Sequence, residues 1–200
     1  MNLEKVKESL NKYQATLHLD SYSRRENLIS EMSKLEAQGT DCSKCSGFCC
    51  TYYHNSMQVT PLEAIEILIE LMESDRLNDE TIERLKANSK KYRLDNEITD
   101  GHGRILRRYY TCPFFNDHSL GCSLSRRAKP YGCLAFNAIE KNVSVEGKCK
   151  SQSGLLEQRE KEFSEVESNL NNELQSSLKL YWIKKPITQA LLDMMMQMSI

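Results

Sequence analysis

The sequence predicts a mostly α-helical protein with a small β hairpin, organised as a single metal-stapled domain with terminal helices. Apolar residues recur every three to four positions near both ends of the chain, as in amphipathic helices. The middle is different, because eight cysteines occur in 200 residues and all lie between positions 42 and 149. We expect an N-terminal helical hairpin at 1–39, a cysteine-cluster metal-binding domain at 40–150, and C-terminal helices at 151–200 that pack on it.

The first part of the chain indicates two helices. Residues 2–17 carry a narrow apolar stripe with helical spacing. Asp20 or Ser21 is a suitable cap for a second helix. We expect the two helices to pack as a hairpin that ends near Gly39 and carries no chemistry.

A strongly apolar helix is expected to begin at Thr60. Residues 40–56 have no apolar period and predict a loop, and residues 57–59 predict a short strand. Thr60 is a good N-cap, Pro61 suits the first helical position, and Glu63 completes a capping box. We expect this to be the most buried helix, with a line of four glutamates, namely Glu63, Glu66, Glu70 and Glu73.

The next elements are a helix and a hairpin. Residues 79–92 predict a third helix with an acidic first turn. Residues 105–111 are rich in β-branched and aromatic side chains and predict a strand. With a turn at 116–121, the expected hairpin carries Cys112 and Cys122 near its open end.

Two helices are expected at the C-terminus. Residues 155–180 predict one long helix, and Pro186 opens a last one. The apolar face of the long helix is expected to comprise Phe163, Val166, Leu170, Leu174, Leu178 and Tyr181. The last helix is rich in methionine, which favours core packing or a homodimer contact over copper binding.

Composition and charge exclude several classes of protein. The chain has 27 basic and 28 acidic residues, so its net charge of −1 disfavours duplex DNA as a partner. No apolar run approaches the roughly 18 residues of a spanning helix. We therefore expect neither a nucleic-acid nor a membrane partner. The charged N-terminus has no secretory signal, which predicts a cytoplasmic location where disulfides would not persist.

The cysteines therefore favour metal ligation over disulfides. Cys42, Cys45, Cys49 and Cys50 form Cys-x2-Cys-x3-Cys-Cys, and two thiolates three residues apart can bind one ion. Neighbouring side chains diverge in most backbone conformations, so the Cys49–Cys50 doublet leaves three interpretations open. These are two nearby metals, a polynuclear cluster, or one ligand beside a spare thiol.

Four more cysteines follow downstream: Cys112, Cys122, Cys133 and Cys149. Neither half pairs two close doublets as a zinc finger does, so we expect the halves to fold together around shared metal. Cys149 has an equal alternative interpretation as a surface thiol. His54 and His118 are minor ligand candidates.

Thiolate sites carry negative charge, which nearby cations or backbone N–H groups would offset. Two basic groups are candidates for this role or for an ordinary solvated surface. They are Arg126, Arg127 and Lys129, and Arg104, Arg107 and Arg108.

At these residues the sequence resembles the cysteine-cluster (CxxCxxxCC) family of zinc- or iron-chelating domain proteins. The resemblance covers about 40–150 and rests on the four-cysteine motif, the Thr-Pro helix start and the Cys-Pro-Phe at 112–114. Further matches to the family pattern are Cys122, Pro130, Cys133 and Phe136, and the departures are Ser125, Lys129 and Leu134.

The resemblance implies a protein that binds zinc or iron, with an iron–sulfur cluster as one form of the cofactor. A similar cysteine cluster occurs in flagellin lysine methylases, where an iron–sulfur centre is implied. Three functions therefore stay open: a cytosolic metal-binding protein, an iron–sulfur-dependent enzyme or redox protein related to protein lysine methylation, and a metal-stapled interaction module whose terminal helices bind a protein. No nucleophile, general base or glycine-rich cofactor loop stands out.

Overall fold

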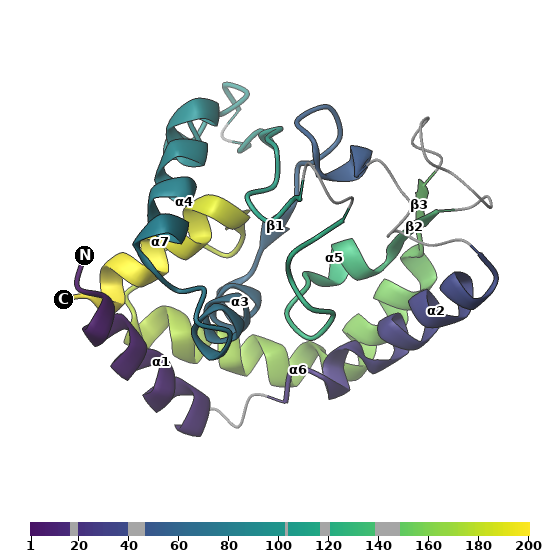
Figure 1. The fold of residues 1–200 in the computed structure, drawn as a ribbon, viewed down its shortest axis with the longest axis horizontal. Coiled ribbons are helices and arrows are strands. Elements are labelled where there is room, and N and C mark those ends of the chain that lie inside the picture. Colours follow the sequence, from purple (N-terminus) through teal and green to yellow (C-terminus); the bar gives the residue numbers. More distant parts are fainter. Residues whose placement is uncertain (17–19, 40–46, 103, 117–120, 139–148) are drawn as a thin grey trace.

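The computed structural model describes residues 1–16, 20–39, 47–102, 104–116, 121–138 and 149–200. This part of the chain is 57% helical and has two small antiparallel sheets, which confirms a mostly α fold with a small β element (Figure 1). The helices are α1 (Leu3–Thr16), η1 (Ser23–Arg25), α2 (Glu26–Ala37), η3 (Phe48–Cys50), α3 (Pro61–Glu73), α4 (Asp79–Tyr92), α5 (Tyr131–Leu134), α6 (Ser153–Ser177) and α7 (Ile187–Met198). The strands are β1 (Gln58–Val59), β2 (Phe136–Ala138), β3 (Cys149–Ser151) and β4 (Lys185–Pro186).

Helix α3 lies at the centre of the core, and ten of its 13 residues are buried. It begins as expected: the Thr60 hydroxyl accepts a hydrogen bond from the Glu63 N–H, and the Glu63 carboxylate accepts one from the Thr60 N–H. These two bonds satisfy N–H groups that the first helical turn leaves unpaired. Helices α1, α6 and α7 pack against α3, and α4 packs against α7 (Figure 1).

The helical hairpin expected within 1–39 is not formed. Helix α1 packs on α3 and α7, whereas α2 packs on α5 and α6. Figure 1 shows α1 and α2 near opposite ends of α6. Each apolar stripe is satisfied by a different surface, with Val6 and Leu10 in the main core and Leu28 and Met32 in a second, smaller core.

The two sheets are not the expected hairpin at 105–124. Strand β1 pairs with β4, with Val59 opposite Lys185, and β2 pairs with β3, with Ala138 opposite Cys149. Only the isolated pair Phe115–Cys122 remains of the expected hairpin.

The predicted strand at 105–111 is wrong because its end bonds to a different part of the chain. The Tyr110 N–H donates to the Asn55 carbonyl at 3.0 Å, and the Cys112 N–H donates to the Cys50 carbonyl at 2.7 Å. These backbone groups are therefore committed to the cysteine-rich segment that precedes β1.

The C-terminal helices match their expected positions, but the predicted face of the long helix is only partly correct. Leu174 is fully buried, whereas Val166 is exposed and Tyr181, beyond the end of α6, is 94% exposed. In α7, Met194, Met195 and Met198 pack in the main core. None of the helices described is both long enough and apolar enough to span a bilayer.

Candidate metal centre

Three segments bring cysteines together: η3, the segment from Tyr110 to Leu124, and α5. The first two are joined by the backbone hydrogen bond between Cys112 and Cys50. They also touch at Gly47, where an added Cβ would lie 2.0 Å from Cε2 of Phe115. Gly47 has φ +70°, a backbone conformation that glycine adopts without penalty. The close approach of these two segments therefore depends on the absence of a side chain at position 47.

The cysteine doublet lies within η3. The Sγ atoms of Cys49 and Cys50 are 4.0 Å apart, and both residues are partly buried. The hydrogen bond to Cys50 and burial raise the pKa of the Cys49 thiol. Cys49, Cys50, Cys112, Cys122 and Cys133 form no disulfide.

Four thiols from the three segments interact electrostatically. Burial raises the pKa of Cys112, and the thiols of Cys122, Cys133 and Cys49 raise it further. Burial likewise raises the pKa of Cys133, with added contributions from Cys122 and Cys49. These mutual effects show that Cys49, Cys112, Cys122 and Cys133 face one region, as the sequence predicts.

Cys122 is held by hydrogen bonds on both sides. The Leu124 N–H donates to the Cys122 sulfur at 3.4 Å, the kind of backbone N–H that offsets thiolate charge. Beyond it, the Ser125 N–H donates to Oε1 of Glu70 at 2.8 Å. Arg76 donates to the Ser123 carbonyl at 2.7 Å and also pairs with Glu70. This segment is therefore fixed to α3 through a glutamate of the predicted acidic line.

Cys133 is positioned by the residue two places before it. The Tyr131 N–H donates to Oε1 of Glu63 at 3.0 Å, and its hydroxyl donates to Glu167 at 2.6 Å. Its ring lies between two guanidinium groups, with Cζ of Arg159 3.1 Å and Cζ of Arg25 4.5 Å from the ring centroid. Cation–π contacts of this kind are strongest when water is excluded.

The same network holds a buried charge cluster that the sequence did not reveal. Arg24 and Arg25 both pair with the carboxylate of Glu66, and Arg24 and Arg159 pair with Glu167. Arg25 also donates to the carbonyls of Lys129 and Ser21. Three arginines thus face three glutamates, including Glu63, so the cluster is close to neutral. The only sequence signal was the glutamate line on an otherwise apolar helix.

The basic residues proposed to offset thiolate charge have different partners. Lys129 lowers the pKa of Cys133 and Cys122 against the dominant effect of burial, so it faces the thiols. Arg126 instead pairs with Glu36, and Arg127 lies 5.3 Å from the Tyr22 ring. In the second group, Arg108 donates to the Tyr92 carbonyl at 2.7 Å.

Other candidate ligands are not brought to the four thiols. Cys42, Cys45 and His118 lie outside the described residues. His54 is exposed and packs on the Phe48 ring at 4.2 Å. Cys149 lies in β3, opposite the strand that follows α5.

The donor chemistry fits zinc or iron, because thiolates are ligands that both prefer. Buried Phe114, next to Cys112, limits access of water to the centre. Among the described side chains alone, however, no three His, Cys, Asp or Glu residues group closely enough to hold one ion. A closed site therefore requires ligands from outside these residues, or a shorter separation of the thiols.

Comparison of the chain with protein-family models, with curated proteins and with solved structures found no match. The resemblance to the cysteine-cluster family therefore stays a prediction from the motif itself.

Proposed function

We propose that this protein holds zinc or iron through cysteine thiolates, at a centre shared by the two cysteine-bearing halves of the chain. The observation that carries the proposal is the convergence of Cys49, Cys112, Cys122 and Cys133 from three separate segments. Apolar cores gather carbon, and the alternatives for so many thiols in one place are disulfides or metal. The thiols that converge here are not bonded to each other.

Cys42 and Cys45 are the proposed ligands that complete the centre. Cys45 precedes Gly47 by two residues, a stretch that extended chain spans in about 7 Å. Gly47 packs on Phe115, three residues after Cys112. The motif therefore enters at the point where the downstream thiols lie. Cys50 and Cys149 are further candidates, and Lys129 is the proposed cation that offsets the thiolate charge.

The metal also implies a compartment. Thiolate ligands must stay reduced, so the proposal places the protein in a reducing environment such as the cytoplasm. An iron–sulfur form of the centre is an outcome of the same experiment, because four thiolates suit both zinc and iron–sulfur clusters.

Metal analysis of the full chain tests the proposal. The protein is purified anaerobically with a reductant, and zinc, iron and acid-labile sulfide are measured per chain. We expect at least one tightly bound metal, with sulfide and brown colour only if the centre is iron–sulfur. Cys112→Ser should lose metal, while the neighbouring substitution Thr111→Ser, which keeps the hydroxyl, should not. A folded wild-type protein with no metal and eight titratable thiols would refute the proposal.

A further inference from the structure

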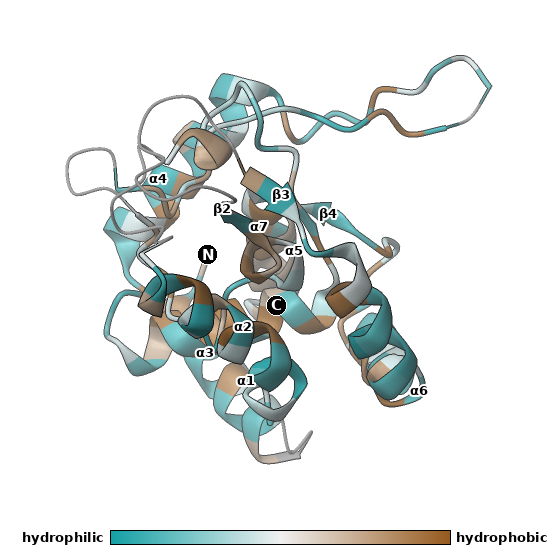
Figure 2. Cartoon of the chain, turned by 90° about the vertical axis from the view of Figure 1, so that its right-hand side faces the viewer, coloured by the Kyte–Doolittle hydropathy of each residue, from teal (hydrophilic) through white to brown (hydrophobic). Residues whose placement is uncertain are grey.

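An exposed loop between α4 and the cysteine region combines apolar and basic side chains. This outer loop (residues 98–102 and 104–109) includes Arg104, Ile105, Leu106 and Arg107, four consecutive exposed residues. Ile105 is 56% and Leu106 46% exposed, and Ile98 beside them is also exposed. Figure 2 shows the loop extending away from the body of the molecule, with apolar colour along it.

The exposed side chains are presented by an ordered backbone. The Leu106 N–H donates to the Ile98 carbonyl at 2.8 Å, and the Asp100 N–H donates to the Arg104 carbonyl at 3.0 Å. Oδ1 of Asp100 accepts from the N–H groups of His102 and Arg104, which closes the turn. The apolar residues are therefore held outward by hydrogen bonds made elsewhere in the loop.

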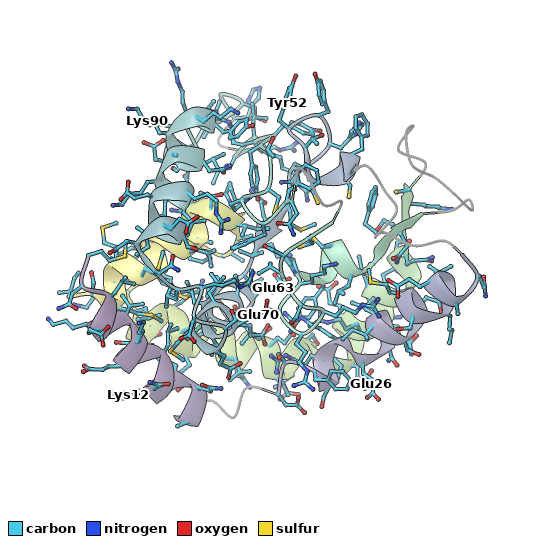
Figure 3. All side chains as sticks on the ribbon, viewed as in Figure 1. Lys12, Glu26, Tyr52, Glu63, Glu70 and Lys90 are labelled. Atoms are coloured by element: carbon cyan, nitrogen blue, oxygen red, sulfur yellow. The ribbon has the colours of Figure 1, made fainter. Side chains whose placement is uncertain are left out.

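Exposed tyrosines lie beside the base of the outer loop. Tyr109 belongs to the loop, and Tyr52 and Tyr53 lie on the neighbouring segment, with ring centroids 3.9 Å apart. The two segments are joined where the Tyr110 N–H donates to the Asn55 carbonyl. Figure 3 shows Tyr52 and Lys90, near the C-terminal end of α4, projecting from the same edge of the molecule.

The charge of this region is opposite to that of the rest of the chain. Residues 90–109 hold six basic and three acidic residues, an excess of three positive charges in a protein with net charge −1. Arg104 and Arg107 flank the aliphatic pair directly. Exposed aliphatic side chains, tyrosines and arginines on one edge are the combination that binds a lipid headgroup region, where each type finds its preferred depth.

We propose that the outer loop docks this protein reversibly on an anionic lipid surface, with Ile105 and Leu106 inserted among the headgroups. Arg104 and Arg107 pair with lipid phosphates, and the three tyrosines lie at the interface. The expectation of no membrane partner rested on the lack of a spanning segment, which does not bear on surface attachment. Single-stranded nucleic acid would use the tyrosines and arginines but leave the aliphatic pair without a role.

Vesicle co-sedimentation of the full chain tests the proposal. The probes are phosphatidylcholine vesicles with and without phosphatidylglycerol. We expect binding only to the anionic vesicles, weakened by added salt because the contact is partly electrostatic. The double substitution Ile105→Ser and Leu106→Ser should lower the partition coefficient at least about tenfold, since two aliphatic side chains no longer leave water. Arg104→Glu with Arg107→Glu should abolish the preference for phosphatidylglycerol.

A matched control separates insertion from general stickiness. Ile183, on the connection between α6 and β4, is 77% exposed, and Ile183→Ser should leave binding unchanged. Trp182 is the single tryptophan and is buried, so an unchanged emission spectrum verifies that each variant is folded. No binding to anionic vesicles at low salt, or an equal loss in Ile183→Ser, would overturn the proposal. So would binding to a single-stranded oligonucleotide that depends on the arginines but not on the aliphatic pair.

Discussion

The charged residues of α3 show how one residue type takes several roles along one helix. Glu63 caps the helix and binds α5, Glu66 pairs with two buried arginines, and Glu70 binds the segment after Cys122. Glu73, at the end of the line, accepts only from Gln14 at 2.7 Å. The same four positions look alike in the sequence, because nothing in their spacing reveals which distant arginine arrives.

Removing the charge of Glu66 should destabilise the protein strongly. Glu66→Gln leaves the buried guanidinium groups of Arg24 and Arg25 without their shared carboxylate. Breaking a buried pair in this way costs about 3–5 kcal/mol in the free energy of unfolding. Glu83→Gln is the control, because Glu83 pairs with Lys86 on the surface, where such a pair contributes about 0–1 kcal/mol. Urea unfolding measures both, and equal small losses would contradict the assigned burial.

The buried thiols also make a prediction about pH. Burial raises the pKa of Cys112, Cys122 and Cys133, so the metal-free folded state retains their protons at pH values where the unfolded chain loses them. Because the unfolded state then binds fewer protons, folding stability falls as pH rises above about 8.5, the usual thiol pKa. Below that pH the contribution is fully present.

The measurement is the urea midpoint of reduced protein in a chelator as pH is raised from about 7.5 to about 9.5, a window that ends below the usual tyrosine pKa of about 10. Cys112→Ala should show a shallower decline than the wild type. A midpoint that stays level across this window would contradict the assigned thiol burial.

At the scale of elements, the contact between η3 and the Cys112 segment depends on Gly47. Gly47→Ala places a Cβ against the Phe115 ring and also forces a side chain into positive φ. Gly39→Ala tests the second effect alone, since Gly39 has φ +84° and nothing within 4 Å of an added Cβ. We expect Gly39→Ala to cost about 1 kcal/mol and Gly47→Ala about 1–3 kcal/mol more.

The double variant Gly47→Ala with Phe115→Leu identifies the cause. The smaller side chain makes room for the added methyl group, so part of the loss should be recovered relative to the sum of the single substitutions. Additive losses would show that Phe115 is not the group that excludes a side chain at position 47.

The elements that the sequence predicted well are those with local signals. The capping box fixed the start of α3, and alternation of apolar and charged residues gave α4. The segment from Ile105 to Thr111 failed because its β propensity is real but its backbone partners, Asn55 and Cys50, lie more than 50 residues away. The apolar face of α6 failed similarly, since Val166 matches the helical period but has no neighbour to pack against.

The candidate centre followed the same division. Cysteine spacing identified the residues, and four of them converge in the structure. The basic stretch could not be assigned from spacing, because Arg126 and Arg127 face α2 and Tyr22 whereas their neighbour Lys129 faces the thiols. Tyr131 gave no signal at all, although its contacts with three arginines set the position of α5.

At the scale of the whole molecule, the candidate centre lies at the margin of the core. The main core joins α1, α3, α4, α6 and α7, and the smaller core joins α2, α5 and α6. Cys112 and Cys122 only pack against the main core from its edge. The apolar contacts between helices therefore do not pass through the thiols, in contrast to a zinc finger, whose fold depends outright on its metal.

Metal removal should accordingly loosen the cysteine segments without unfolding the helices. After chelation under reducing conditions, we expect unchanged far-ultraviolet circular dichroism, because the helices keep their buried contacts. Amide hydrogen exchange should accelerate at Asn55, Tyr110 and Cys112, whose neighbouring backbone bonds join the two segments, since local opening no longer requires breaking metal–sulfur bonds. Amides within α3 and α7 are the internal control and should keep their protection. Cooperative loss of all helical signal on chelation would instead show that the metal supplies most of the folding free energy, and that the apolar core alone does not hold the chain.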